Sequence, residues 1–232
     1  MNDFLKGASR VIGVVAGFFP IAVSFGAVSV QAGIPAIATI GMSMGVYAGA
    51  SQFAAAEAVR QGLPWFSIVL TMLIINLRHI PMSLAAAQKI YNRFPWGKRW
   101  LLAHGLIDET FALNMLDEPR SFLYYLGMNV SCWSAWVLGT CLGAVVGLQI
   151  PERWLQFALP AMFLYLLTDN VRRLWGREVV VVIGIGVALA LVTQSFGSTG
   201  ILIAILGVAI AATLLLNPPS SASISDAKEG SS

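Results

Sequence analysis

A short stretch inside an apolar segment holds several groups that can bind a charged solute: Asn76-Leu77-Arg78-His79-Ile80-Pro81. At about 1.5 Å of helix rise per residue, Arg78 lies roughly 15–20 Å from each end of that segment, near the middle of a membrane. Pro81 has no N–H, so we expect the Leu77 carbonyl to lose its helical donor. A guanidinium, an imidazole, an amide and a free carbonyl together can bind a carboxylate and respond to protons. Alternatively, Arg78 only pairs with a carboxylate and locks two helices together.

Two neighbouring acids, Asp108 and Glu109, lie about half-way along the short apolar segment 101–116. Keeping a charge inside a membrane costs about 2.5–3.5 kcal/mol on insertion scales, so such residues point to function. A carboxyl group removed from water holds its proton more tightly, which suits proton coupling. We expect one of these acids to carry a proton or to pair with Arg78. The alternative is that both acids are solvated at the membrane interface.

A third stretch is small and polar inside a charge-free run: Tyr47-Ala48-Gly49-Ala50-Ser51-Gln52-Phe53. Gly49 permits a close backbone approach, and Ser51 and Gln52 offer hydrogen bonds to a solute in a cavity. The same residues fit close helix packing with hydrogen bonds between helices, and the sequence leaves both interpretations open.

One motif resembles that of a serine hydrolase, the G-x-S-x-G pattern of Gly41-Met42-Ser43-Met44-Gly45. An intramembrane protease would need a histidine from another helix, such as His79 or His104. A nucleophile elbow also needs a strand before the serine, and the sequence predicts none. No metal-ligand spacing, P-loop or dinucleotide fingerprint is present. We therefore expect no enzyme, no metal and no cofactor, and keep the protease only as a remote alternative.

The elements that position these residues are membrane helices. Of the 232 residues 57% are hydrophobic and 11% are charged, and the mean hydropathy is +0.77. Runs without a charged residue cover 11–56, 121–151 and 179–225, beyond the ~20 residues that a spanning helix needs. Because the apolar residues do not alternate as in strands, we predict an all-α integral membrane protein. This excludes a disordered chain, a disulfide scaffold and an ordinary soluble enzyme.

We predict about seven transmembrane helices from eight apolar segments: 11–32, 36–58, 65–88, 101–116, 121–150, 155–171, 179–197 and 200–216. Residues 1–10 form a cytoplasmic N-terminus, 11–216 a single transmembrane transport domain, and the Ser-rich residues 217–232 a disordered tail. The pI near 9.1 does not indicate nucleic acid, because the basic residues lie in loops where they orient the chain in the membrane.

The basic loops create a parity problem. Three clusters favour the cytoplasm: Lys6 and Arg10; Lys89, Arg93, Lys98 and Arg99; and Arg172, Arg173 and Arg177. Three segments separate each cluster from the next, and three full crossings cannot return to the same side. One segment in each set is therefore re-entrant or broken, or one cluster lies outside. We expect 101–116 to be a half-helix, and either 11–32 or 36–58 to break.

Two glycine triplets suggest an internal repeat. Gly41, Gly45 and Gly49 are spaced by four residues, and so are Gly139, Gly143 and Gly147. Each triplet predicts a smooth stripe that another helix can approach closely. Transporters often contain repeated halves, but Gly-x-x-x-Gly is also common in membrane helices of every kind.

The sequence resembles the AzlC family of branched-chain amino-acid permeases. The resemblance rests on four stretches: Pro20–Gly26, Tyr47–Phe53, Ile75–His79 and Ile107–Leu113, with sequences PIAVSFG, YAGASQF, INLRH and IDETFAL. It covers roughly residues 5–216, although the carboxyl half matches mainly in hydropathy. The resemblance implies a multi-pass secondary transporter of the prokaryotic inner membrane that exports branched-chain amino acids. It also implies a second, small membrane subunit of the AzlD type.

We therefore expect export of valine, leucine and isoleucine, and also of methionine, driven by the proton gradient. The expected substrate-binding residues are Arg78, Asn76, His79, Gly49, Ser51 and Gln52, and the expected proton-coupling or ion-pairing residues are Asp108 and Glu109. The expected partners are the AzlD-type subunit, the amino acid and membrane lipid, without nucleic acid. The main alternative is a non-transporting assembly subunit of a membrane complex.

Overall fold

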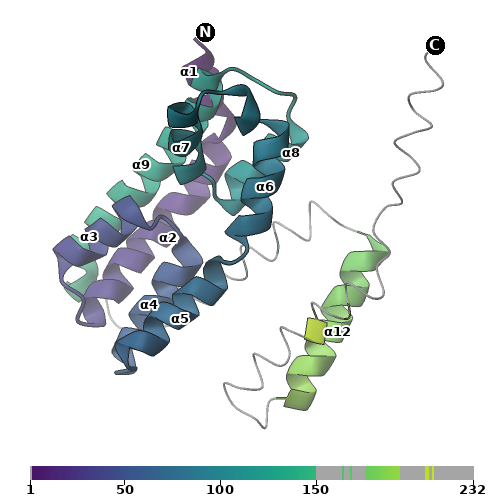
Figure 1. Cartoon of the computed structure of the whole chain (residues 1–232). Helices are drawn as coiled ribbons and strands as arrows, with labels where there is room; N and C mark the ends of the chain where they lie inside the picture. Colours follow the sequence, from purple (N-terminus) through teal and green to yellow (C-terminus); the bar gives the residue numbers. More distant parts are fainter. Residues whose placement is uncertain are drawn as a thin grey trace, which may run out of the picture. The chain divides into compact units, whose positions relative to one another are not determined.

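The computed structural model (Figure 1) describes residues 2–149, 164, 168, 176–193, 207, 208 and 211. The chain divides into two compact units, Met1–Leu164 and Tyr165–Ser232, which are described separately here. Apart from single residues, the predicted segments 155–171 and 200–216 lie outside the described residues, as do Arg172, Arg173 and the predicted tail 217–232.

All regular secondary structure in the described ranges is helical. The first unit contains α1 (Asp3–Arg10), α2 (Ile12–Gln31), α3 (Ala36–Gly45), α4 (Gly49–Arg60), α5 (Trp65–Asn76), α6 (His79–Lys89), η1 (Tyr91–Arg93), α7 (Trp96–His104), α8 (Asp108–Leu116), α9 (Phe122–Val146) and η2 (Gly147–Gln149); the second unit contains α12 (Arg177–Thr193). Three described stretches are long and apolar enough to cross a membrane: Ile12–Gln31, Trp65–Lys89 and Phe122–Gln149. The prediction of an all-α membrane protein is confirmed.

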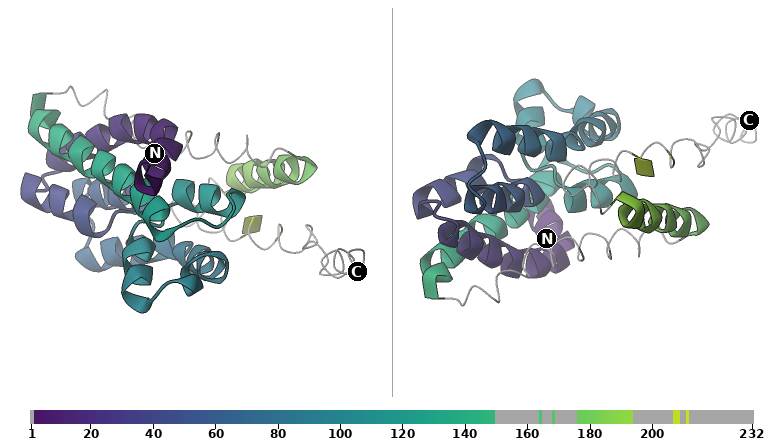
Figure 2. Two further views of the ribbon diagram at one scale, coloured as in Figure 1. Left: turned by 90° about the horizontal axis from the view of Figure 1, so that it is seen from above. Right: turned by 90° about the horizontal axis from the view of Figure 1, so that it is seen from below.

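Helix α9 is the central element of the first unit, where it packs against α1, α2, α3 and α7. Figures 1 and 2 show α2 and α9 side by side. Glycines allow this close approach: a Cβ atom at Gly143 would overlap the Val23 carbonyl oxygen, and one at Gly26 would overlap that of Thr140. Gly139 and Gly147 also lie against α2, so the predicted stripe on this helix is confirmed.

The matching glycines of α3 are not covered by any described part of the chain, because a Cβ atom at Gly41 or Gly45 would meet none of its atoms within 4 Å. The two glycine triplets therefore have different packing roles, and the internal repeat they suggested gains no support from them.

Residues 36–60 form a hairpin of two half-length helices, α3 and α4. Near its start, the Thr39 hydroxyl donates to Ser29 Oγ at 2.9 Å, close to the end of α2. Its tip reaches the middle of α9, where Trp133 Nε1 donates to the Met44 carbonyl at 3.2 Å. Helix α4 then returns and packs along α5, which follows it after a short turn. This first hairpin therefore enters the unit and leaves it at the same end.

Residues 96–116 form a second hairpin, α7 and α8. It starts beside the first turn of α9, where the ring centroids of Phe94 and Phe122 are 5.9 Å apart. It ends beside the last residue of α6, where Lys89 Nζ donates to the Met115 carbonyl at 2.6 Å. Both ends of this hairpin therefore lie where α6 ends and α9 begins.

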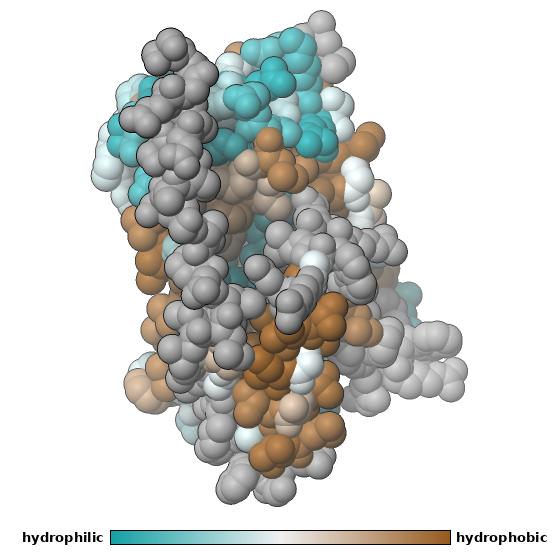
Figure 3. Space-filling model, turned by 90° about the vertical axis from the view of Figure 1, so that its right-hand side faces the viewer, coloured by the Kyte–Doolittle hydropathy of each residue, from teal (hydrophilic) through white to brown (hydrophobic). Residues whose placement is uncertain are grey.

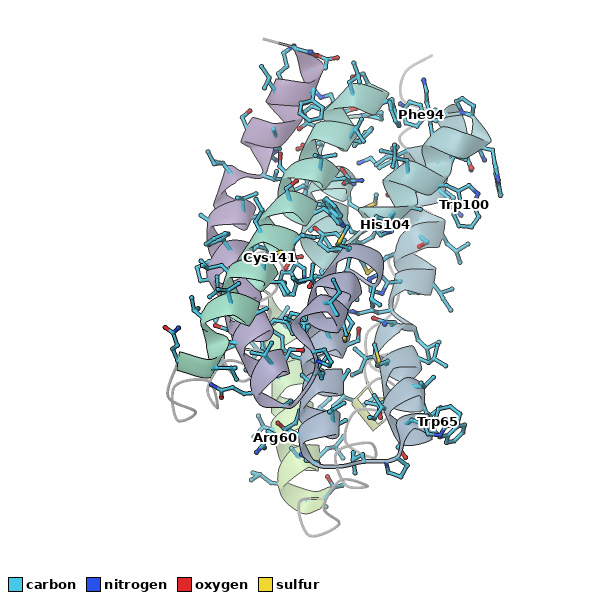
Figure 4. All side chains as sticks on the ribbon, turned by 90° about the vertical axis from the view of Figure 1, so that its left-hand side faces the viewer. Arg60, Trp65, Phe94, Trp100, His104 and Cys141 are labelled. Atoms are coloured by element: carbon cyan, nitrogen blue, oxygen red, sulfur yellow. The ribbon has the colours of Figure 1, made fainter. Side chains whose placement is uncertain are left out.

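The two hairpins enter the unit from opposite ends. Figure 4 shows Phe94 and Trp100 at one end of the unit, Arg60 and Trp65 at the other, and His104 between them. In Figure 3, polar residues gather at the upper end, where α7 lies in Figure 1.

This arrangement removes the parity problem for the first two basic clusters. Between Arg10 and Lys89 only α2 and the pair α5–α6 run from end to end, so both residues lie at the same end. Segment 36–58 breaks, as one alternative predicted, whereas 11–32 continues as α2 through Pro20. The half-helix expected in 101–116 is present as α8, and a further break, between α5 and α6, was not predicted.

Candidate functional site

Three interruptions of the helices lie close together in the first unit, at residues 46–48, 77–78 and 105–107. Side-chain contacts join them: Arg78 pairs with Asp108, Asn76 bonds Ser51, and the ring of Tyr47 lies beside that of His104. We name these six residues the hairpin junction. It lies between the two ends of the unit and is the candidate functional site.

The interruption between α5 and α6 follows from Pro81, but with a different result from the one expected. The Leu77 carbonyl is not free, because it accepts the Ile80 N–H at 3.0 Å. The Leu77 N–H likewise donates three residues back, to the Ile74 carbonyl at 3.2 Å. Such bonds tighten the chain as in a 3₁₀ turn, and this turn compensates for the missing N–H of proline. The prediction that the Leu77 carbonyl is free is therefore wrong.

Arg78 and Asp108 form an ion pair, with 2.8 Å between Nη1 and Oδ2. Their side chains keep 35% and 30% of their surface accessible, and Arg78 Nε is buried without a hydrogen-bond partner. The pair connects the α5–α6 interruption to the start of α8. Because a guanidinium has five N–H donors, Arg78 can hold Asp108 and bind a further anion at the same time.

Both predicted acids lie in the first turn of α8, where the positive end of the helix dipole favours them. The N–H of Ile107 donates to Thr110 Oγ1 at 3.0 Å, so Thr110 fixes the start of the helix. Glu109 is buried, with 3% of its surface accessible, and Asp108 is paired. Neither acid is therefore fully solvated, which was the alternative that the sequence left open.

The predicted polar contacts divide into two groups, and the first belongs to the hairpin junction. Asn76 Nδ2 donates to Ser51 Oγ at 3.1 Å, while Asn76 Oδ1 is buried without a partner. His79 Nδ1 lies 3.2 Å from the Asn76 carbonyl oxygen. Gly49 is the first residue of α4, two positions before Ser51, and is partly accessible.

The second group is a closed ring of hydrogen bonds that contains Gln52. Gln52 Nε2 donates to Ser43 Oγ at 3.1 Å, and Ser43 shares a 2.8 Å hydrogen bond with Thr140. Thr140 donates to the Trp136 carbonyl, and Trp136 Nε1 donates to Gln52 Oε1. The side chain of Gln52 is thereby used in joining α3, α4 and α9. The bonding partners of Ser43 are a threonine and a glutamine, not the histidine that a protease would need.

The analysis of the sequence missed Tyr47 as an individual residue. Its φ angle is +45°, a left-handed conformation that costs about 1–3 kcal/mol for a residue with a side chain. The residue is 4% exposed, its ring centroid lies 6.2 Å from that of His104, and its hydroxyl is buried without a partner. The only signal in the sequence is a large polar aromatic residue that starts a stretch of small ones.

Among the described residues, no group of three or more His, Cys, Asp or Glu side chains is placed to hold a metal ion.

Comparison with known proteins identifies relatives that are membrane proteins. A family model described as AzlC protein matches residues 13–150, which include the whole hairpin junction. An uncharacterized membrane protein of Archaeoglobus fulgidus is 35% identical over 209 residues, covering 88% of this chain and 91% of its own length. The inner membrane protein YgaZ of Escherichia coli is 30% identical over 181 residues, covering 73% and 74%.

A third relative carries a functional name. The branched-chain amino acid transport protein AzlC of Bacillus subtilis is 24% identical over 233 residues, covering 96% of this chain and 89% of its own length. No solved structure matches the chain.

Proposed function

The chain belongs to the AzlC family of membrane transport proteins, and on this premise we propose that it exports branched-chain amino acids across the prokaryotic inner membrane. The name of the Bacillus subtilis relative supports this class of substrate. The observation that carries the proposal is the Arg78–Asp108 ion pair, which lies where three interrupted helices meet, between the ends of a membrane-spanning unit. Interrupted backbone at this depth is tolerated where it lines a cavity or is buried in protein.

In this proposal the charged ends of the amino acid bind at the hairpin junction. Arg78 holds Asp108 with one nitrogen and offers its remaining N–H groups to the substrate carboxylate. Glu109, which is buried beside Asp108, receives the ammonium group or carries the coupling proton. Ser51 and Asn76 supply further polar contacts. Burial of an acid in a membrane protein is a common feature of proton relays, which supports coupling to the proton gradient.

The aliphatic side chain of the substrate would occupy an apolar pocket. Such a pocket separates substrates that differ by one methylene by only ~1–3 kcal/mol. Valine, leucine, isoleucine and methionine are therefore expected to share the site. The transporter would act with the small AzlD-type membrane subunit that the family resemblance implies.

A second candidate function is an assembly subunit without a substrate of its own. The Arg78–Asp108 pair favours this candidate as well, because an ion pair between two elements also locks them together. On this alternative, substitution of either residue lowers the yield of the complex but leaves transport per assembled complex unchanged.

The deciding experiment measures export of labelled valine from loaded cells that express the chain with its small partner subunit. Arg78→Ala should lower export per inserted protein at least tenfold, since a lost charge-assisted contact is worth about 1.5–3 kcal/mol. The matched control is Arg60→Ala, whose guanidinium pairs with Glu57 at an end of the unit. Unchanged export by a normally inserted Arg78→Ala variant would remove Arg78 from the mechanism and favour the assembly subunit.

A further inference from the structure

We propose that the Tyr47 hydroxyl binds the carboxylate of the transported amino acid. Tyr47 would then be a determinant of selection for free amino acids over compounds that lack this negative charge. The inference rests on the proposed function and adds a residue and a chemical group to it.

The first observation is that the Tyr47 hydroxyl is buried and has no hydrogen-bond partner. A phenol removed from water usually bonds to a protein group, because an unsatisfied buried donor is costly. The other buried tyrosine hydroxyls of the described residues follow this rule: Tyr91 donates to the Leu102 carbonyl, Tyr124 donates to Asp117 Oδ2, and the Tyr125 oxygen accepts the Arg120 N–H. Tyr47 is the exception, and it lies in the hairpin junction.

The second observation is the backbone at Tyr47. A φ angle of +45° is uncommon for any residue with a side chain, and a glycine at this position would avoid the strain. The conformation directs the chain from α3 into α4 and brings the phenol ring beside His104 of the second hairpin. Strain of this kind is concentrated at functional sites, where the surrounding structure maintains it.

The third observation concerns the charges around Tyr47. It stands directly before Ala48, the N-cap of α4, where no side chain caps the helix and the first turn contains no acid. Without an acid in its own first turn, the positive end of α4 favours a negative group beside Tyr47. The Tyr47 hydroxyl also lies within electrostatic reach of Cys132 on α9 and of the buried Glu109. A zwitterion fits this arrangement with its carboxylate toward Tyr47 and α4 and its ammonium toward the acids.

The test compares valine with valinamide, which keeps the side chain and the amino group but lacks the carboxylate. Everted membrane vesicles containing the chain and its small partner subunit are used, so that export appears as uptake of labelled valine. Tyr47→Phe removes only the hydroxyl oxygen. The matched control is Tyr91→Phe, which makes the same change at a buried tyrosine outside the hairpin junction.

We expect Tyr47→Phe to raise the valine concentration for half-maximal uptake roughly tenfold to a hundredfold, as for a lost hydrogen bond to a charged group. The valinamide concentration needed to compete should change much less. Tyr91→Phe should leave both concentrations unchanged. The melting temperature of Tyr47→Phe should not fall, since its hydroxyl has no partner in the protein.

Three results would overturn the inference while leaving the proposed function intact. The wild type takes up valine and Tyr47→Phe does so with the same half-maximal concentration; Tyr47→Phe loses affinity for valine and for valinamide equally; or Tyr47→Phe has a lower melting temperature that accounts for its weaker uptake. Wild-type vesicles that take up no valine would instead overturn the proposed function, and this inference with it.

Discussion

The indole nitrogen of Trp136 donates a hydrogen bond of 3.0 Å to Oε1 of Gln52, 84 positions earlier in the chain. Both residues are buried, and the bond connects the first turn of α4 to the middle of α9. It holds the returning arm of the first hairpin against the central helix. The side-chain amide of Gln52 therefore acts as a structural connector next to the hairpin junction.

Gln52→Leu should destabilise the protein without weakening its affinity for valine. The substitution leaves the indole N–H of Trp136 without its acceptor, which costs about 1–3 kcal/mol for a buried polar group. Thermal unfolding in detergent and valine uptake per folded protein would be measured together. Gln61→Leu, at an exposed position after α4, is the control and should alter neither quantity much. Weaker valine affinity at an unchanged melting temperature would show that Gln52 binds the substrate directly.

Gly143→Ala should disrupt the contact between α2 and α9. The added Cβ atom overlaps the Val23 carbonyl oxygen, and backbone cannot move aside as a side-chain end can. We expect a loss of about 1–3 kcal/mol, typical of overpacking, measured as a lower melting temperature and a lower yield of folded protein. Gly41→Ala is the matched control, because its Cβ meets open space and alanine favours the helix. Equal stability of the two variants would contradict the packing described for Gly143.

The ion pair between Arg10 and Asp117 should make stability depend on pH. Hydrogen bonds of 3.0 and 2.8 Å from Arg10 hold the pKa of Asp117 below its ordinary value of 3.8, against the opposing effect of partial burial. A carboxyl group whose pKa is lowered by folding stabilises the protein above the pKa of the unfolded chain. This stabilisation is lost as the pH falls through the lower, folded-state pKa.

Asp117→Asn should therefore lower stability at pH 7 by about 0.5–1 kcal/mol, as for a partly exposed ion pair. The difference from the wild type should begin to shrink below about pH 4, near the pKa of the unfolded chain, and should vanish once the pH is below the lower, folded-state pKa. Melting temperatures measured from pH 3 to pH 7 test this expectation. Glu118→Gln, at an exposed position on the same loop, is the control for loss of a negative charge. A difference that does not shrink between pH 5 and pH 3 would refute the linkage.

Labelling of single cysteines should place residues 61 and 97 on opposite sides of the membrane. Gly97→Cys and Glu118→Cys lie at the end that holds the first two basic clusters, whereas Gln61→Cys lies next to Arg60 at the other end. Cys132 and Cys141 are first replaced by alanine. A membrane-impermeant maleimide applied to intact cells should label position 61 and spare positions 97 and 118, because basic loops remain in the cytoplasm. Labelling of 61 and 97 from one side would contradict the two opposed hairpins.

Composition and periodicity were sufficient for the fold class and for part of the packing. Charge-free runs identify membrane helices because lipid tolerates few other sequences, and the stripe at Gly139 and Gly143 identifies the face of α9 that meets α2. The same spacing at Gly41 and Gly45 occurs on a face that no described part of the chain covers. Spacing fixes the face of a helix that carries the glycines, but it does not indicate whether another helix covers that face.

Composition and periodicity could not predict whether an apolar segment crosses the membrane or turns back as a hairpin. Hydropathy measures the length of an apolar segment, and a straight span and a hairpin of equal length have the same composition. Basic loops indicated that one segment had to turn back, but they did not place the turn at Tyr47, whose ring lies beside His104 of the second hairpin. The pairing of Arg78 with Asp108 was expected as one of two alternatives, because two opposite charges in lipid favour each other.

The half-length hairpins also determine how thick the permeability barrier is. Helix α4 has 12 residues and α8 has 9, so each rises only about 14–18 Å, roughly half of a hydrocarbon core. In the proposed function, a solute bound at the hairpin junction would have one short hairpin of the first unit between it and each end of that unit. Displacing one hairpin would then expose the solute at one end while the other hairpin still covers it, without a tilt of the spanning helices.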